Sequence, residues 1–340
     1  MSFSKRSLKL SLVAALVAVL ITLSSIYVFR WMTSPVAERS AISFEVRRGE
    51  SVIQIAARLN TAGWLRHPTL WSLWARWRGL SGKLRAGEYQ LTPDLSPQTM
   101  LQLLSSGKVL LHRLTIVEGS TYQNLRAILT ARDDVQQTLD GASDAELIQM
   151  LNISSNQLEG RFFPDTYYFA KNTSDINILR MASRRMQSEL DLAWQGCESN
   201  CPVKSPDELL ILASIVEKET AKSTERPLIA GVFLERLKRG IRLQSDPTVI
   251  YGLGAQYDGN IRKKDLLRDT PFNTYTRQGL PPTPIALPGA ASLQAVAHPQ
   301  RTGAIYFVAS GNPDGSHVFS KTLQEHNAAV RRYLKTIRAH

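Results

Sequence analysis

Two glutamates, Glu217 and Glu219, end a long apolar run and carry the side chains best suited to acid–base chemistry. The run ILASIVEKETA, at residues 211–221, is apolar around most of a helical circumference, so we expect a buried helix. We predict that this helix begins after Ser205, which can form a capping box with Glu208. At about 100° per residue, the two carboxyl groups that end the run point in different directions.

Glu219 is the better candidate for proton transfer. It lies one helical turn after Ile215 and extends an apolar row, whereas Glu217 lies nearer the polar edge that holds Lys218. Burial raises the pKa of a carboxyl group and keeps it protonated, as a general acid requires. The alternative interpretation is a boundary carboxylate paired with Lys222 one turn further on.

Polar side chains gather again in two later segments, RLQSDPTVIYG at 242–252 and the residues before the proline-rich loop 279–289. Proline-fixed loops make stiff walls at little entropic cost. Hydroxyl, amide and aromatic groups on such walls suit a sugar cleft, although they also suit an ordinary tight loop. The hydrogen-bonding and aromatic side chains in these segments are Gln244, Ser245, Asp246, Thr248, Asn273 and Tyr275.

Motifs for other common chemistries are absent from the sequence. It lacks H-E-x-x-H, G-x-S-x-G and the P-loop pattern. His298, His317 and His326 are far apart in sequence, so we predict no metal site and no cofactor. Cys197 and Cys201 can close a small disulfide loop in an oxidising compartment, and too few ligands surround them for a zinc site.

Residues 10–29 form an uncharged apolar stretch that predicts a membrane-spanning helix. Its 20 residues would make a helix about 30 Å long, the thickness of the hydrocarbon core of a bilayer. Tyr27 and Trp31 lie where an interfacial aromatic belt is expected. A modest excess of positive charge before the stretch favours a cytoplasmic N-terminus: Lys5, Arg6 and Lys9 precede it, and Arg30 and Arg39 follow it.

A cleaved signal peptide is the alternative to an anchor. Its apolar region is usually about 7–15 residues long and ends in small residues, whereas this stretch is longer and Arg30 follows it directly. We therefore predict a single-pass protein of the cell inner membrane with its catalytic part in the periplasm. The net charge of +12 then favours attraction to the anionic leaflet over nucleic-acid binding, for which no aromatic-studded basic motif argues.

The rest of the chain predicts an α+β fold. Three units of similar construction, each a short strand, a turn and a helix, begin near residues 42, 87 and 112. Tryptophans between the first two units fall on mostly apolar helical spacing, so we interpret them as core residues and not as a sugar platform; they are Trp64, Trp71, Trp74 and Trp77. Residues 305–310 and 317–320 flank a turn signal and predict a hairpin, followed by a final helix.

Two family resemblances bear on function. FEVRRGESVIQIAARL, at residues 44–59, resembles a LysM-like module, the type that binds N-acetylglucosamine polymers, although a generic strand–helix unit looks much the same. From about Leu111 onward the chain closely resembles the YceG-like family of endolytic murein transglycosylases. The motifs that carry this second resemblance are TIVEG (115–119), LEGRFFPDTYYF (158–169), ILASIVEKETA (211–221), RLQSDPTVIYG (242–252), FNTYTRQGLPPTPIALPG (272–289), ASLQAVAHP (291–299) and YFVASGNPDGSHVFSKTLQEHN (306–327).

The resemblance implies a lyase that cleaves the β-1,4 bond between N-acetylmuramic acid and N-acetylglucosamine within peptidoglycan strands and leaves a 1,6-anhydro end. It places catalysis on the second glutamate of E-K-E, which is Glu219. It makes Gln244, Asn273 and Tyr275 candidate cleft residues, and we give Asp246 a structural or substrate-orienting role. Peptidoglycan synthases are expected partners by the same resemblance. A hydrolytic muramidase and a non-catalytic peptidoglycan-binding scaffold remain alternatives.

The predicted organisation places a small module between the anchor and the catalytic domain. We expect a cytoplasmic N-terminus (1–9), a transmembrane helix (10–31), a linker (32–41), a LysM-like α/β module (42–110) and a mixed α+β YceG-like catalytic domain (111–340).

Overall fold

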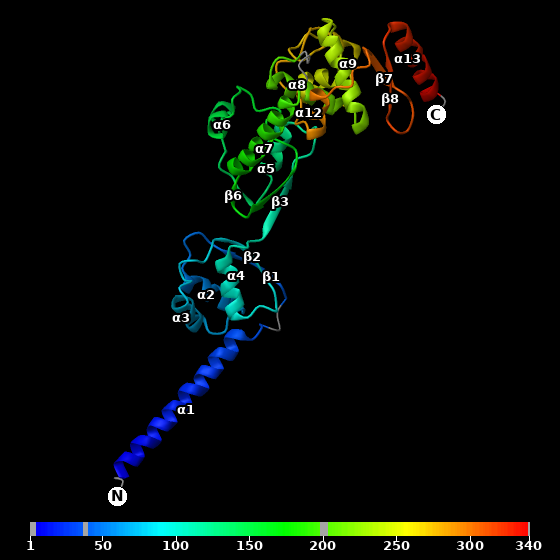
Figure 1. The fold of residues 1–340 in the computed structure, drawn as a ribbon. Coiled ribbons are helices and arrows are strands. Elements are labelled where there is room, and N and C mark those ends of the chain that lie inside the picture. Colours follow the sequence, from blue (N-terminus) through cyan, green and yellow to red (C-terminus); the bar gives the residue numbers. More distant parts are fainter. Residues whose placement is uncertain (1–4, 37–39, 198–202, 339–340) are drawn as a thin grey trace. The chain divides into compact units, whose positions relative to one another are not determined.

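A computed structural model describes residues 5–36, 40–197 and 203–338. These divide into two compact units (Figure 1). Unit 1 comprises Met1–His112 and Phe169–Asn172, and unit 2 comprises Arg113–Tyr168 and Thr173–His340. The architecture is mixed α+β, as predicted, because helices alternate with short strands that pair two at a time within the described residues.

Unit 1 begins with a long apolar helix, α1 (Lys5–Thr33). Its segment Leu10–Thr33 is, by length and composition, the one candidate membrane span among the described residues. Apolar side chains of this segment, such as Leu16 and Ile21, are more than half exposed. A helix whose apolar residues are exposed on all sides along most of its length fits either a membrane anchor or a signal sequence.

The globular part of unit 1 is a two-stranded sheet packed with three helices. The strands pair antiparallel, with Phe44 opposite Tyr89. Serine caps close the starts of two helices by reciprocal hydrogen bonds at Ser51 and Ser96, and Gly107 ends the last helix in a left-handed conformation. The elements are β1 (Ile42–Val46), α2 (Val52–Thr61), α3 (Pro68–Trp77), β2 (Gly87–Leu91) and α4 (Pro97–Ser106).

The predicted tryptophan core is correct in part. Trp64 and Trp71 are fully buried in the core of unit 1, and the indole nitrogen of Trp71 donates a hydrogen bond to the Pro97 carbonyl at 2.8 Å. Trp74 only packs against the edge of this core. Trp77 is 73% exposed, so its interpretation as a core residue is wrong. Trp77 lies on the outer face of α3. The helical period groups residues on one face of a helix but does not show whether that face is buried or exposed.

Unit 2 is mainly helical. The boundary between the units falls within a pair of strands, β3 (Leu111–Thr115) and β5 (Thr166–Ala170). The other elements of unit 2 are α5 (Tyr122–Thr130), β4 (Val135–Gln136), α6 (Asp144–Leu151), β6 (Thr173–Ser174), α7 (Asp175–Gln195), α8 (Pro206–Glu219), α9 (Arg226–Lys238), α10 (Asp246–Leu253), α11 (Lys263–Leu267), α12 (Ala290–Ala297), β7 (Tyr306–Ala309), β8 (His317–Ser320) and α13 (Leu323–Arg338), with short 3₁₀ turns at Ser223–Glu225 and Gly254–Gln256.

Helix α8 is the centre of unit 2. It packs against α7, α9 and α12 (Figure 1), and its residues from Leu209 to Val216 are almost all buried, as the sequence predicts. The predicted hairpin of β7 and β8 is confirmed, with Phe307 opposite Phe319 in antiparallel register. Cys197 follows α7, whereas Cys201 lies outside the described residues, so their disulfide stays a prediction.

Helix α9 contains a glycine at a point of close chain approach. The Gln300 backbone amide donates to the Pro227 carbonyl at 2.9 Å. A Cβ atom at Gly231 would lie 2.3 Å from the backbone oxygen of Gln300. Main chain, unlike a flexible side-chain tip, cannot move aside cheaply, so glycine is required for α9 to contact this segment.

We therefore expect Gly231→Ala to destabilise the protein, although alanine normally favours a helix by about 1 kcal/mol over glycine. Overpacking of this kind costs about 1–3 kcal/mol. The measurement is denaturant unfolding of the full chain in detergent. Gly82→Ala is the matched control, because a Cβ there meets nothing within 4 Å. Equal stability of the two variants would contradict the close-approach argument.

Candidate active site

The candidate site lies at the C-terminal end of α8. The helix starts as predicted, with the Ser205 hydroxyl accepting a hydrogen bond from the Glu208 amide at 3.2 Å. The second half of the predicted capping box differs, because the Glu208 carboxylate accepts from Lys204 instead of from Ser205. This start and the buried apolar face hold α8 rigidly, so the side chain of Glu219 at its last residue has a defined position.

Glu219 occupies an environment that favours its protonated form. Burial raises the pKa of its carboxyl to about 7, and the nearby carboxylate of Asp246 adds to the shift. Two groups oppose this shift: the hydroxyl of Ser245, which donates to Glu219 at 2.5 Å, and the positive charge of Arg236. A carboxyl with a pKa near neutrality can both give and accept a proton, which suits general acid–base catalysis.

The predicted residues Asp246 and Tyr275 lie together beside Glu219. The Tyr275 hydroxyl donates to the Asp246 carboxylate at 2.6 Å. The two segments are joined through Thr274, whose side-chain oxygen accepts from the Ser245 amide at 3.0 Å and whose carbonyl accepts from the Gln244 amide at 3.1 Å. These bonds fix the turn that leads into α10 and so direct the Ser245 hydroxyl at Glu219.

Gln244 and Asn273 have different surroundings. Gln244 is exposed and has a positive φ of 51°, an uncommon conformation for a residue other than glycine. Asn273 is buried, and its side-chain amide donates to three backbone carbonyls of residues 265–268 while its oxygen accepts from the Tyr275 amide at 2.8 Å. The Asn273 side chain therefore holds a loop, whereas that of Gln244 faces solvent.

The expected position of Glu217 at a polar edge is wrong. Its side chain is only 4% exposed, and its carboxylate pairs with Arg226 at 2.8 Å. The same carboxylate accepts from the Ser292 hydroxyl at 2.8 Å and from the Gly289 amide at 3.0 Å. Three donors compensate for the burial of its carboxylate, so Glu217 has a structural role.

The alternative pairing of Glu219 with Lys222 is also wrong. The Lys222 ammonium group pairs with Asp314 at 2.7 Å, in the turn between β7 and β8. Glu219 is therefore left without that cation. Its carboxyl accepts a hydrogen bond from the Ser245 hydroxyl, which is neutral, and its pKa is raised.

Segments that are distant in the sequence are attached to the second half of α8. The Ser214 hydroxyl accepts from the Ile285 amide at 3.0 Å and so ties the proline-rich loop to the helix. The Lys218 ammonium group donates to the Gly119 carbonyl at 3.1 Å, and the Leu287 carbonyl accepts from the Gly119 amide at 2.9 Å. Loops that are distant in sequence are thus fastened to one helix end.

A cavity of 880 Å³ opens beside this helix end. Lys218 of α8, Pro247 of α10 and Ile285 of the proline-rich loop contribute to its wall. Such a mixture of aromatic and amide groups over an apolar surface is typical of carbohydrate sites. The aromatic and amide side chains in its lining are Tyr122, Tyr251, Tyr257, Phe272, Gln123, Asn124, Asn156 and Gln157.

Glu159, in the wall of this cavity, is a titratable residue that the sequence interpretation missed. It accepts hydrogen bonds from the amide of Tyr122 at 3.0 Å and from the hydroxyl of Tyr251 at 3.1 Å. Burial nevertheless raises the pKa of Glu159 above its ordinary value. The sequence feature that could have identified Glu159 is its place in the motif LEGRFFPDTYYF. Ser245 was noted as polar, but nothing in its spacing marks it as the partner of Glu219.

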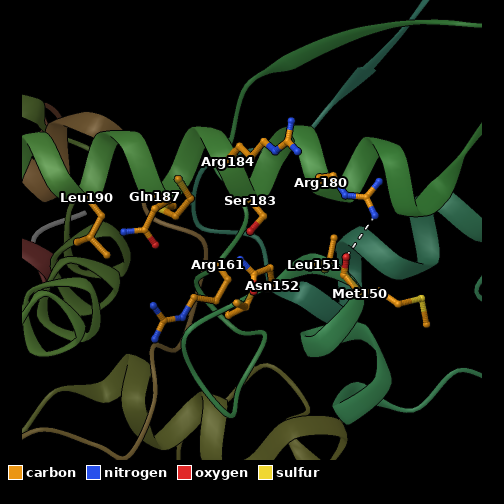
Figure 2. A pocket seen from close by; sticks show the side chains of 11 residues that line it. Met150, Leu151, Asn152, Arg161, Arg180, Ser183, Arg184, Gln187 and Leu190 are labelled. Atoms are coloured by element: carbon orange, nitrogen blue, oxygen red, sulfur yellow. Dashed lines mark hydrogen bonds between the residues drawn. The ribbon is translucent and has the colours of Figure 1, made fainter.

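A second pocket, of 220 Å³, lies between α7 and the end of α6 and is rich in arginine (Figure 2). Arg180 donates to the Met150 carbonyl at 3.2 Å, and Arg161 pairs with Asp207 at 2.7 Å. The guanidinium groups of these two residues and of Arg184 point in different directions in Figure 2. They do not converge on one point, so this pocket does not have the geometry of an anion site.

Two of the histidines noted in the sequence have partners within unit 2. Within the ranges that the structure describes, no group of three or more His, Cys, Asp and Glu side chains is arranged to hold a metal ion. His317 is instead paired with Glu225 at 2.7 Å, and His326 stacks on Tyr306.

Comparison with known proteins identifies the family. The model of the YceG-like family matches residues 44–332, and the chain belongs to this family. An endolytic murein transglycosylase of Bacillus subtilis is 31% identical over 317 residues, which cover 88% of this chain and 86% of that protein. A protein of the same name from Streptococcus pneumoniae is 27% identical; the match covers 87% of this chain but only 59% of the longer streptococcal protein.

A solved structure supports the same assignment. The crystal structure of a putative yceG-like protein from Listeria monocytogenes is 29% identical and superposes with a TM-score of 0.55. The match covers 85% of this chain and 98% of that one. The family likeness therefore extends over both units and not only over the end of α8.

We expect Glu219→Gln to change how stability depends on pH. Native Glu219 has a pKa of about 7 against an ordinary value of 4.5. Between these values the folded protein keeps a proton that the unfolded chain releases, so wild-type stability falls as pH rises through this window. Glutamine has no such proton. The variant should therefore gain stability relative to wild type between about pH 4 and about pH 8, by at most about 3 kcal/mol.

Denaturant unfolding at both pH values measures this gain. The partial exposure of Glu219 reduces it below the upper bound, because water screens the charge. Asp133→Asn, which removes an exposed carboxylate of unit 2, is the control for a general effect of charge. A stability difference between Glu219→Gln and wild type that is the same at both pH values would mean that burial does not raise this pKa.

Proposed function

We propose that this chain is a membrane-anchored endolytic lytic transglycosylase, a lyase that cleaves peptidoglycan glycan strands internally. Family membership and the names of the relatives in Bacillus subtilis and Streptococcus pneumoniae support the reaction class. The observation that carries the proposal for this chain is the carboxyl of Glu219 at the end of α8, whose pKa is raised to about 7, close to a large cavity lined with aromatic and amide groups.

Glu219 acts first as the acid in the proposed mechanism. The bond cleaved is the β-1,4 bond between N-acetylmuramic acid and N-acetylglucosamine. Protonated Glu219 gives its proton to the glycosidic oxygen, and the bond from that oxygen to the muramic acid C1 breaks. The positive charge of Arg236 and the hydroxyl of Ser245 both stabilise the carboxylate that this step leaves behind.

Glu219 then acts as the base. The 6-hydroxyl of the same muramic acid attacks C1, Glu219 takes the hydroxyl proton, and the product carries a 1,6-anhydro ring. No water is consumed, and the carboxyl returns to its starting state. Because the nucleophile belongs to the substrate, the second carboxylate that glycosidases ordinarily need is dispensable. Asp246, held by Tyr275, raises the pKa of Glu219 and helps to orient the sugar.

The cavity beside α8 is the proposed binding site for the glycan strand. Its volume of 880 Å³ accommodates more than one sugar ring, and its aromatic side chains offer flat apolar faces. Gln244 and Tyr275 are not part of the cavity lining; in the proposal they border the reacting bond next to Glu219. Asn273 contributes by holding the loop that positions Tyr275, because its amide groups are already used by backbone partners.

In this proposal, unit 1 determines where the protein is located in the cell. Helix α1 anchors the protein in the cell inner membrane by a single pass, with the N-terminus inside and the globular part of unit 1 and unit 2 in the periplasm. The globular part of unit 1 has two helices, α2 and α3, between its paired strands and acts as a LysM-like module that binds the glycan. The enzyme acts on strands near the membrane, where peptidoglycan synthases are the expected partners.

Glu219→Gln should abolish cleavage of purified glycan strands, with a loss of at least about a hundredfold, as expected when a general acid–base group is removed. The measurement is release of anhydro-ended fragments by the full chain in detergent. Glu217→Gln is the matched control. It removes a carboxylate that pairs with Arg226, so it should lower stability while leaving the reaction of the folded protein largely intact.

Three outcomes of that assay would contradict the proposal. Cleavage by Glu219→Gln at the wild-type rate would remove Glu219 from the mechanism. Inactivity of folded Glu217→Gln, with Glu219→Gln active, would assign the chemistry to the other glutamate. Reducing ends in place of anhydro ends would identify a hydrolytic muramidase, in which water resolves the intermediate.

Substitutions in the cavity should weaken binding of the strand without affecting the chemistry. Tyr257→Ala removes one aromatic face and should raise KM about two- to tenfold, because an aromatic contact is worth about 0.5–1.5 kcal/mol. The kcat value should change little. Tyr168→Ala removes an exposed tyrosine outside the cavity and is the control. An unchanged KM for Tyr257→Ala would place the glycan elsewhere.

A further inference from the structure

Helix α3 presents an apolar row that no other described element covers. Leu70, Leu73 and Trp77 are 38%, 53% and 73% exposed. Their spacing of three and four residues places all three on one face of the helix. The opposite face, which includes Trp71 and Ala75, is buried in the core of unit 1. A row of large apolar side chains of this kind on a stable helix is typical of an interaction surface.

The start of α3 is tied to the end of α1 through His67. Met32 of α1 is buried in the core of unit 1, and Val28 and Trp31 pack against the same core. The Tyr27 hydroxyl lies 3.0 Å from the imidazole of His67, the residue directly before α3. The indole of Trp31 contacts the same imidazole edge-on, with ring centroids 5.0 Å apart. The start of α3 therefore lies at the level of Tyr27, in the last turns of the apolar helix.

The surroundings of α3 carry positive charge. Residues 62–86 contain five Lys and Arg residues and no Asp or Glu. All five are exposed: Arg66, Arg76, Arg78, Lys83 and Arg85. A helix with an apolar face and flanking arginines is the pattern of segments that lie in the interface of an anionic bilayer.

We infer that α3 docks in the interfacial region of the same bilayer that α1 crosses. Leu70, Leu73 and Trp77 insert among the upper acyl chains, and Arg76 and Arg78 contact anionic lipid headgroups. This inference rests on the proposed membrane anchor. It adds a second membrane contact, which fixes the orientation of the globular part of unit 1 and not only its distance from the bilayer.

The position of α3 favours lipid over sugar as the occupant of this face. An exposed tryptophan can also stack on a glycan. However, the leucines beside Trp77 offer no hydrogen bond to sugar hydroxyls, whereas they gain directly from contact with acyl chains. The fixed contact of His67 with Tyr27 and Trp31 also brings the start of α3 to the end of the span, where Tyr and Trp commonly lie in the interface.

The test uses the full chain in vesicles of phosphatidylethanolamine and phosphatidylglycerol. Nitroxide labels are placed one at a time by Leu73→Cys, Val17→Cys and Gln90→Cys, after replacement of the native cysteines. Relaxation by oxygen, which concentrates in lipid, is compared with relaxation by a water-soluble nickel chelate. Val17 lies within α1 and reports the anchor, and Gln90 is an exposed position on β2.

We expect the ratio of oxygen to nickel accessibility to be several-fold higher at Leu73 than at Gln90, and highest at Val17. A Leu73 ratio equal to that of Gln90, with Val17 in lipid, overturns the docking of α3 and leaves the anchor intact. A low ratio at Val17 overturns the anchor itself. Protection of the Leu73 label from the nickel chelate only on addition of glycan strands would assign this face to sugar and also overturn the inference.

Discussion

Glu217 and Glu219 end the same helix in different surroundings, and the organisation of unit 2 depends on keeping them so. Arg226 and two hydrogen-bond donors surround the Glu217 carboxylate. Burial raises the pKa of Glu219 to about 7, and the Ser245 hydroxyl donates a hydrogen bond to its carboxyl group. The Glu217 carboxylate is paired with a cation and the Glu219 carboxyl is not, although the two residues are separated by one position. This difference requires loops with defined positions around the end of α8.

The loops around α8 meet this requirement through backbone contacts more than through side-chain packing. Ser214 accepts from the Ile285 amide, Lys218 donates to the Gly119 carbonyl, and Thr274 links two loop segments beside Glu219. Backbone groups cannot change their positions without moving the chain, so a network of this kind holds a site more rigidly than flexible side chains do. The buried Asn273 has the same role in the loop that carries Tyr275.

Local features of the sequence were sufficient for much of this structure. The period of α8 predicts its burial and selects Glu219, and the turn residues between β7 and β8 predict the hairpin. Features that depend on distant partners were not predictable. Helical spacing placed Glu217 near a polar edge of α8. It could not show the contacts of Glu217 with Arg226, Gly289 and Ser292, because these residues lie outside the helix. The face of α3 with Trp77 looked like core because periodicity finds an apolar row without saying what covers it.

The partners of Glu217 also affect the order of events during biosynthesis. Gly289 is 72 residues away along the chain, so the contact closes a long loop and forms only after that loop has been made. Until then the end of α8 lacks the Gly289 and Ser292 donors and the proline-rich loop beside it. An incomplete chain therefore lacks part of the structure around Glu219. If Glu219 is the catalytic group, as proposed, cleavage of glycan strands depends on the completed fold.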